Sequence, residues 1–199
     1  MPMIRETIVT TLNAASKVHI APLGLIAESP GAEGLGPEGG GWIIAPFRPS
    51  TTLDNLRANP HAVANFTDDV LIFAGCLTGN RDWPTRPATR VPGVVLDGAL
   101  AHAELTVSHV EEDEQRPRFH CKLVFEVSHA PFKGFNRAQS AVIEAAILAS
   151  RLHMLPREKI EAELAYLQIA VEKTAGPREH EAWRLLVEKI EDHFKHAPV

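Results

Sequence analysis

The chain has 199 residues, a formal net charge of −5, 45% hydrophobic residues and 23% charged residues. This ordinary globular composition excludes a disordered chain, a collagen and a coiled-coil rod, and the length is sufficient to bury a hydrophobic core. The slightly acidic balance lacks the basic footprint of a nucleic-acid binder, and no apolar run approaches the roughly 18–20 residues that span a bilayer. We therefore expect neither nucleic acid nor a membrane as a partner.

In chain order, residues 1–130 consist of short apolar runs broken by Gly and Pro, which predicts a β-rich body. Alternating and β-branched segments predict the first strands, over residues 6–12, 18–26, 42–47 and 62–66. Gly, Pro and Glu predict a surface loop over 28–41. The segment from Pro49 to Pro60 predicts a short helix with a hydroxyl cap and a stop at Asn59-Pro60.

The spacing of the apolar residues changes in the later part of the chain. Residues 70–77 have helical spacing, with Asp68 as the cap and Gly79 as the end, although strand alternation fits nearly as well. A loop over 79–92 and two longer strands over 94–110 and 118–128 follow. From Asn136 onward a period of 3.6 predicts helices, first with an alanine-rich face, then from Pro156 and again after Gly176-Pro177. We predict an α+β fold, with one domain over 1–155 and a helical hairpin over 156–199 packed on it.

Cysteine and histidine spacing indicate no metal chemistry. Cys76 and Cys121 belong to no CxxC pair, and the ten histidines form no HExxH motif. The first ten residues have no signal-peptide pattern. We predict two buried thiols, no metal site and a cytoplasmic location.

The most informative segment is Pro46-Phe-Arg-Pro-Ser-Thr-Thr-Leu, where a strand runs into a helix start. Helix N-termini present free N–H groups and a positive dipole end, and Arg48, Ser50, Thr51 and Thr52 add donors there. A plain helix cap explains one hydroxyl, whereas three hydroxyls and an arginine exceed what a cap needs. The residues alone leave both interpretations open.

A second segment, His19-Ile-Ala-Pro-Leu-Gly, combines small residues with a proline. Such a strand lets a planar ligand approach the backbone, and it is equally typical of an edge strand with a bulge. Arg137 at a helix start also has two interpretations: it reaches a phosphate across a dimer, or it pairs with a carboxylate.

Four runs together resemble the FMN-binding split-barrel superfamily, on its flavin-reductase side, and within it the family called domain of unknown function 447. They are Lys17-Val-His-Ile-Ala-Pro-Leu-Gly, Trp42-Ile-Ile-Ala-Pro-Phe-Arg-Pro-Ser-Thr-Thr-Leu-Asp-Asn-Leu, Ala62-Val-Ala-Asn-Phe-Thr-Asp-Asp and Phe135-Asn-Arg-Ala. The resemblance implies a six-stranded Greek-key split barrel with short helices, a homodimer, and FMN as the cofactor near the dimer interface.

The resemblance also implies the site. Ser50 and Thr52 match hydroxyls that hold the flavin phosphate, and Arg48 and Thr51 are placed beside them by adjacency. Asn65 and Thr67 match the end of the strand next to the flavin. The residues whose backbone faces the flavin ring are His19, Ile20, Ala21, Pro22 and Leu23.

The function implied is flavin-dependent redox chemistry, in which a small-molecule partner exchanges hydride or electrons with the flavin. The alternatives are a non-catalytic FMN carrier or sensor, an accessory protein of a pterin pathway, and a related barrel that holds coenzyme F420 or haem instead. The chain lacks the Arg and Lys set of pyridoxamine-phosphate oxidases, which disfavours that activity.

Overall fold

A computed structural model describes residues 3–28 and 41–196, and the loop predicted over 28–41 falls almost entirely outside them. The described residues form two compact units. The first comprises the residues up to Thr67 together with 83–131, and the second comprises 68–82 and 132–196. The contacts therefore group the helix after residue 136 with the later helices, and the boundary at 155 and 156 stays a prediction.

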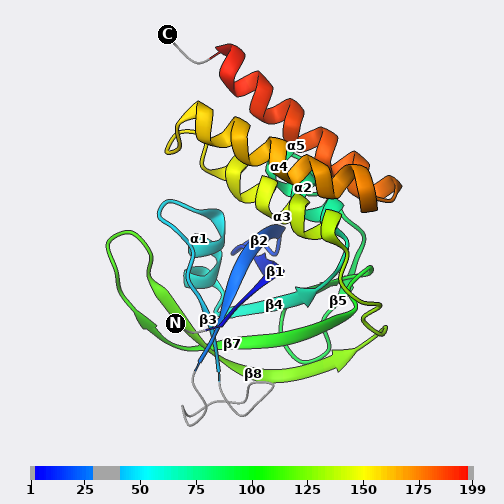
Figure 1. Cartoon of the computed structure of the whole chain (residues 1–199). Coiled ribbons are helices and arrows are strands. Elements are labelled where there is room, and N and C mark those ends of the chain that lie inside the picture. The colour runs from blue at the N-terminus through cyan, green and yellow to red at the C-terminus, as the bar shows by residue number, and fades with distance from the viewer. Residues whose placement is uncertain (1–2, 29–40, 197–199) are drawn as a thin grey trace. The chain divides into compact units, whose positions relative to one another are not determined.

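The first unit is a closed antiparallel barrel with the strand order β1-β2-β3-β8-β7-β4 (Figure 1). Its strands are β1 (Ile4–Leu12), β2 (Val18–Ala27), β3 (Trp42–Ile44), β4 (His61–Phe66), β7 (Ala101–Glu111) and β8 (Arg118–Ser128). A two-stranded sheet of β5 (Thr85–Pro87) and β6 (Val94–Leu96) and the helix α1 (Thr51–Ala58) complete the unit. The split barrel and the α+β class predicted from the sequence are confirmed.

Alternation along the strands decides which side chains fill the barrel. Ala103 and Leu105 of β7 lie in the core with Trp42 and Phe119, whereas His102 and Glu104, which alternate with them, belong to the opposite face. From α1, Leu53 and Leu56 join the same core. Cys121 is also buried there, and burial raises the pKa of its thiol to about 12. Cys76 is buried in the helix α2 (Val70–Thr78), so both predictions of buried thiols are confirmed.

Four element predictions need correction. β3 ends at Ile44, because Pro46 has no N–H to continue the ladder. The strand predicted over 94–110 is two strands in different sheets, separated at Asp97 and Gly98. The loop predicted over 79–92 contains β5. The cap of the next helix is Asp69, not Asp68, since the Asp69 carboxylate accepts from the Leu71 N–H.

The second unit consists of helices that pack side by side (Figure 1). They are α2 (Val70–Thr78), α3 (Arg137–Ser150), α4 (Arg157–Thr174) and α5 (Pro177–His196). The helical interpretation of α2 is confirmed, and it ends at Gly79 with φ of 104°, a left-handed conformation that suits glycine. The alanine face of α3 is buried, and Ala138 and Ala141 pack against Val171 of α4. No helix among the described residues is long and apolar enough to cross a membrane.

The alanine face generates the first prediction. Ala145 is fully buried, so Ala145→Leu must displace a neighbouring helix and should lower the free energy of unfolding by about 1–3 kcal/mol. Ser140→Leu on the exposed side of α3 is the control and should stay near the wild-type value. Urea unfolding measures both, and equal midpoints for the two variants would contradict close packing at Ala145.

Candidate functional site

The connection from β3 to α1 places the predicted hydroxyls at one helix end. Ser50 is the cap: its Oγ accepts from the Leu53 N–H at 3.3 Å. Thr51 is exposed and Thr52 is buried, and neither hydroxyl hydrogen-bonds to any described residue. The first N–H groups of a helix also have no partner within the helix. A set of donors is therefore left at the start of α1 after capping is satisfied.

Arg48 in the same connection has an acidic partner. Its Nη2 lies 2.7 Å from Glu112 Oε2, and its Nε donates to the carbonyl of Asp113 at 3.2 Å. Glu112 also pairs with Arg57 of α1 at 2.7 Å. These pairs are solvent-exposed, so each contributes little to stability. They join the acidic turn between β7 and β8 to both ends of α1, and the charge of Arg48 is compensated in this structure.

The segment His19 to Leu23 lies in β2. The pairing of β2 with its neighbouring strands shows which of its two edges a ligand could approach. Residues 18–26 pair with β1, whereas β3 pairs only with Leu25, Ile26 and Ala27. Among the described residues, no strand pairs with the second edge of β2 over residues 18–24. Ile20 is buried, and His19, Ala21, Pro22 and Leu23 are half-buried. This part of β2 is thus an edge strand, although its register with β1 shows no bulge. An edge without a neighbouring strand also suits a planar ligand that approaches the backbone.

Asn65 has an internal role in the structure. Its side chain is fully buried, and its Nδ2 donates to the Ile8 carbonyl at 3.0 Å. Its Oδ1 accepts from the Leu96 N–H at 2.9 Å, which ties β6 to the barrel. Thr67 is half-buried just beyond the end of β4. Arg137, the first residue of α3, is exposed and belongs to the second unit.

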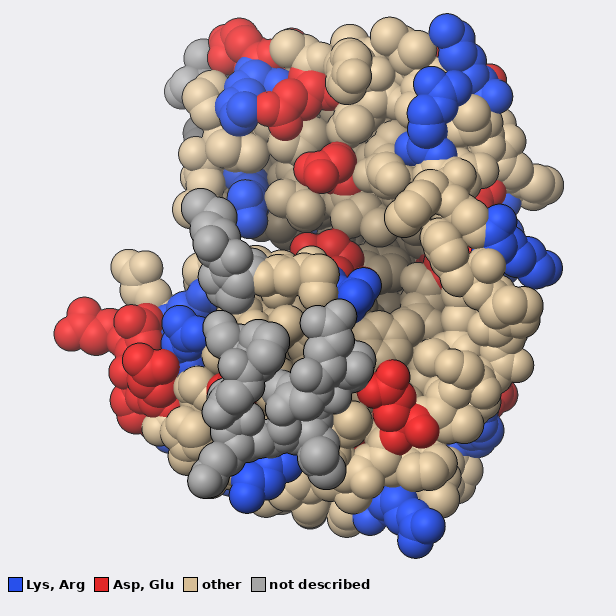
Figure 2. Space-filling model, turned by 60° about the horizontal axis from the view of Figure 1, so that its bottom comes forward, with Lys and Arg blue, Asp and Glu red and all other residues tan. Residues whose placement is uncertain are grey.

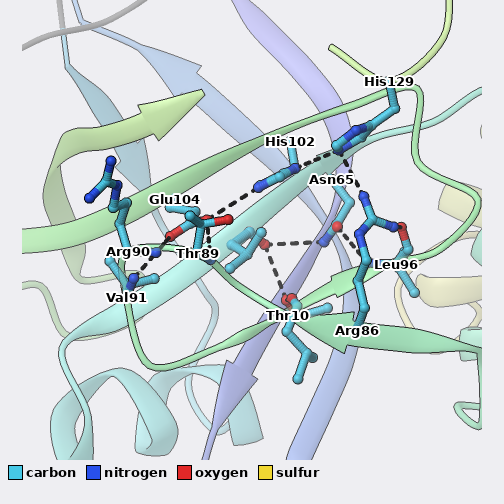
Figure 3. A network of polar contacts seen from close by, with 12 residues as sticks. Thr10, Asn65, Arg86, Thr89, Arg90, Val91, Leu96, His102, Glu104 and His129 are labelled. Atoms are coloured by element: carbon cyan, nitrogen blue, oxygen red, sulfur yellow. Dashed lines mark hydrogen bonds and ion pairs between the residues drawn. The ribbon is translucent and has the colours of Figure 1, made fainter. Parts of the chain in front are cut away.

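A buried polar network that the sequence did not reveal lies on the outer face of β7 (Figure 3). Glu104 is fully buried, and its carboxylate accepts from the N–H groups of Thr89, Arg90 and Val91 at 2.6–2.9 Å. Burial raises the pKa of Glu104, but these three hydrogen bonds and a fourth from His102 outweigh it and hold the pKa below its ordinary value. The carboxylate is ionised and anchors the segment that precedes β6.

The network continues to the surface through two histidines. His102 Nε2 lies 3.3 Å from Glu104 Oε1, and His102 Nδ1 lies 2.8 Å from His129 Nε2. The Nη2 of Arg86 also lies 2.9 Å from His129 Nε2, and a guanidinium can only donate. His129 Nε2 therefore accepts from Arg86, and His102 links His129 to the Glu104 carboxylate. Partial desolvation and the charges of Arg86 and His102 lower the pKa of His129.

The sequence signal for this network is weak. His102 and Glu104 alternate with apolar residues, which is typical of a strand face exposed to water. Their burial depends on residues 84–97 crossing over that face, a contact between segments that local spacing does not encode. Among the described residues, no group of three or more His, Cys, Asp or Glu is arranged to hold a metal ion.

Charged residues of both signs are interspersed on the face of the molecule in Figure 2. This agrees with the small net charge of −5. The expectation that nucleic acid is not a partner stays a prediction.

A closed antiparallel barrel with a short helix after β3 defines the split-barrel fold. Family models described as "protein of unknown function (DUF447)" match residues 5–130 with the N-terminal domain and residues 136–188 with the remainder. The chain belongs to this family. No curated protein matches it.

Several solved structures are similar to the chain. An FMN-bound protein of the same family from Methanosarcina mazei has a TM-score of 0.77 and 18% identity, over 95% of this chain and 96% of that chain. The 2-nitrobenzoate 2-nitroreductase of Pseudomonas fluorescens has a TM-score of 0.51 and 18% identity, over 65% and 66%. The NADH:FAD oxidoreductase of Streptomyces globisporus has a TM-score of 0.51 and 13% identity, over 62% and 70%. Identities this low establish the shared fold.

The network generates a second prediction. Glu104→Gln replaces one acceptor oxygen by a donor that faces backbone N–H groups, so at neutral pH it should lower the free energy of unfolding by about 1–3 kcal/mol. Glu126→Gln, at an exposed position of β8, is the matched control and should change little. Chemical unfolding at pH 7 measures both, and an unchanged Glu104→Gln variant would remove the anchoring role.

The lowered pKa predicts the pH dependence of the same pair. Because the folded pKa of Glu104 lies below its ordinary value of 4.5, its contribution is complete above pH 4.5 and is lost as pH falls through the folded pKa. The stability difference between wild type and Glu104→Gln should therefore be constant from pH 6 toward 4.5 and shrink on further acidification. Unfolding curves at a series of pH values test this, and a difference that grows on acidification would reverse the assigned shift.

Proposed function

We propose that this chain binds FMN and acts as a flavin-dependent oxidoreductase of the flavin-reductase type. The observation that supports it most directly is the donor set at the start of α1, where the Thr51 and Thr52 hydroxyls hydrogen-bond to no described residue. The similarity to an FMN-bound protein of the same family supports the same cofactor. Flavin-reducing and nitro-reducing proteins among the similar structures support redox chemistry.

The residues of the chain fit a flavin mononucleotide in two respects. Hydroxyl and N–H donors at a helix N-terminus suit the terminal phosphate, since both donate and the helix dipole favours an anion. The edge of β2 over residues 20–24, where no described strand pairs with it, suits the polar edge of the flavin ring. When bound, the flavin supplies the hydride or electron transfer itself. The chain would bind and orient it, and this proposal assigns no side chain as an acid or base.

Arg48 already has a carboxylate partner, which limits its role in phosphate binding. Its guanidinium pairs with Glu112, so it would contact a phosphate only by sharing its donors with that carboxylate or by exchanging partners. Ser50 likewise caps α1 and would act mainly by holding the helix start in place. We assign direct phosphate contact to Thr51 and Thr52 and a supporting role to Arg48 and Ser50.

We also propose an oligomeric state, a location and a partner for the protein. We infer a homodimer in the cytoplasm that meets a small-molecule redox partner, with Arg137 reaching toward the cofactor of the second copy. Asn65 would act by supporting β4 beside the flavin, because its amide is occupied by the main chain of Ile8 and Leu96.

Titration with FMN and with riboflavin tests the phosphate contact, because riboflavin has the same ring and no phosphate. Thr51→Val and Thr52→Val each remove one hydroxyl with little change in shape. Each should weaken FMN binding by about 1.5–3 kcal/mol, or roughly 10- to 100-fold in Kd, and leave riboflavin binding unchanged. Flavin fluorescence measures both constants.

The matched control is Thr89→Val, at an exposed threonine outside α1, and it should bind FMN as the wild type does. Unchanged FMN binding in both α1 variants would exclude the phosphate site, and equal losses for riboflavin would mean that the hydroxyls do not contact the phosphate. NADH or NADPH oxidation by the FMN-loaded protein then tests catalysis. Stable FMN binding without any oxidation would favour the carrier or sensor.

A further inference from the structure

Helix α4 has an apolar face that the rest of the second unit does not cover. Its inner face is buried through Ile160 and Val171. On its outer side, Ala162, Ala165, Tyr166 and Ile169 are all exposed, Tyr166 to 76% and Ile169 to 47%. These residues form an exposed apolar patch on α4, and such a patch is typical of an interaction site.

The exposed residues follow the spacing of a helix-pairing seam. Ala162, Tyr166 and Ile169 are separated by four and three residues, and the same rhythm continues to Lys159 on one side and Lys173 on the other. The seam is therefore apolar in its centre and charged at both ends. We name these residues, together with Glu158, Ala165 and Glu172, the α4 seam.

The charges of the α4 seam fit an antiparallel copy of itself. With a two-fold axis between Ala165 and Tyr166, Glu158 lies opposite Lys173 of the second copy, and Lys159 lies opposite Glu172. The same register sets Ala162 opposite Ile169. A parallel pairing would instead set Lys159 against Lys159 and Lys173 against Lys173, which like-charge repulsion opposes.

The side-chain contacts of the end charges agree with this register. Glu158 and Lys173 make no ion pair or side-chain hydrogen bond with any described residue, although both lie on a helix rich in such pairs. Lys159 pairs with Glu163, and Glu172 accepts from Gln168. Within the α4 seam, the two charges that have no partner among the described residues are thus the two that face each other across the axis.

A groove beside the α4 seam provides space for the protruding tyrosine. It lies between α4 and α5, has a volume of about 760 Å³ and is lined on its apolar side by Leu164, Ala165, Trp183, Val187, Ile190 and Phe194. The antiparallel register puts Tyr166 of each copy over Ala165 of the other, at the edge of this groove. A protrusion and a recess on one helix are self-complementary, as an isologous interface requires.

We infer that two copies of this chain associate through antiparallel pairing of α4, with Tyr166 of each copy seated at the α4–α5 groove of the other. This interface uses only the second unit and is independent of flavin binding. It exists whether or not the barrel unit forms a further contact between copies.

Sedimentation equilibrium over a concentration series in the micromolar range tests the interface on the full-length protein. Tyr166→Glu puts a charge at the centre of the α4 seam and should halve the mass of the assembly. Tyr166→Phe keeps the ring and should leave the mass as in wild type. Far-UV circular dichroism of both variants separates lost association from lost helix.

Charge reversal tests the register. Glu158→Lys and Lys173→Glu each create two like-charge pairs across the axis and should each raise the dissociation constant about tenfold or more. The double variant restores opposite charges and should return to within about threefold of wild type. Thermal unfolding measures any helix destabilisation from the reversals separately.

Three results would each overturn the inference. The first is a wild-type protein that stays monomeric throughout the series. The second is an assembly whose mass Tyr166→Glu does not change, which would place the interface elsewhere. The third is a double variant that dissociates as readily as the single ones, since the antiparallel register predicts its rescue.

Discussion

Burial of one ionised carboxylate, that of Glu104, is the constraint on which the outer wall of the barrel depends. A carboxylate removed from water must be surrounded by donors, and here three consecutive backbone N–H groups and His102 surround it. Those N–H groups belong to the segment that leads into β6, so the charge determines where that segment crosses the barrel. Val91 and Val95 then pack on Val63, and Asn65 receives the Leu96 N–H. One polar interaction thereby organises an apolar cluster and a second polar one.

Hydrogen-bond partners also distinguish the polar side chains that stabilise the fold from those that remain available to a ligand. Ser50 and Asn65 both came from the resemblance as site residues, and both use their side chains on the main chain of this protein. Within the described part of the chain, Thr51 and Thr52 do not, although they lie beside Ser50 on the same helix turn. In this short run of hydroxyls, one member therefore caps the helix, whereas its neighbours remain available to bind an anion.

Local patterns predicted most of the strands and helices, because alternation, period and capping act within a few residues. The split barrel itself was implied by the resemblance to the family. The local patterns failed where distant segments decide the outcome. His102 and Glu104 have the alternation of a solvent-facing edge, and only the crossing of residues 84–97 buries them. The break at Asp97 and Gly98 was missed because valines and leucines on both sides are equally strand-like. Arg48 was expected to be available to a phosphate, but its partner Glu112 lies 64 residues away in the chain.

The position of β1 has a consequence for how the protein is made. β1 pairs with β2, its neighbour in sequence, and also with β4, while β3 pairs with β8. The ring of strands therefore cannot close until β8, which ends at Ser128, has been synthesised. During translation the earlier strands must wait as an open sheet with unpaired edges, the state in which β-rich chains are most exposed to wrong partners. Closure therefore comes late, and of the helices of the second unit only α3, α4 and α5 follow the strand that allows it, since α2 precedes β7 and β8.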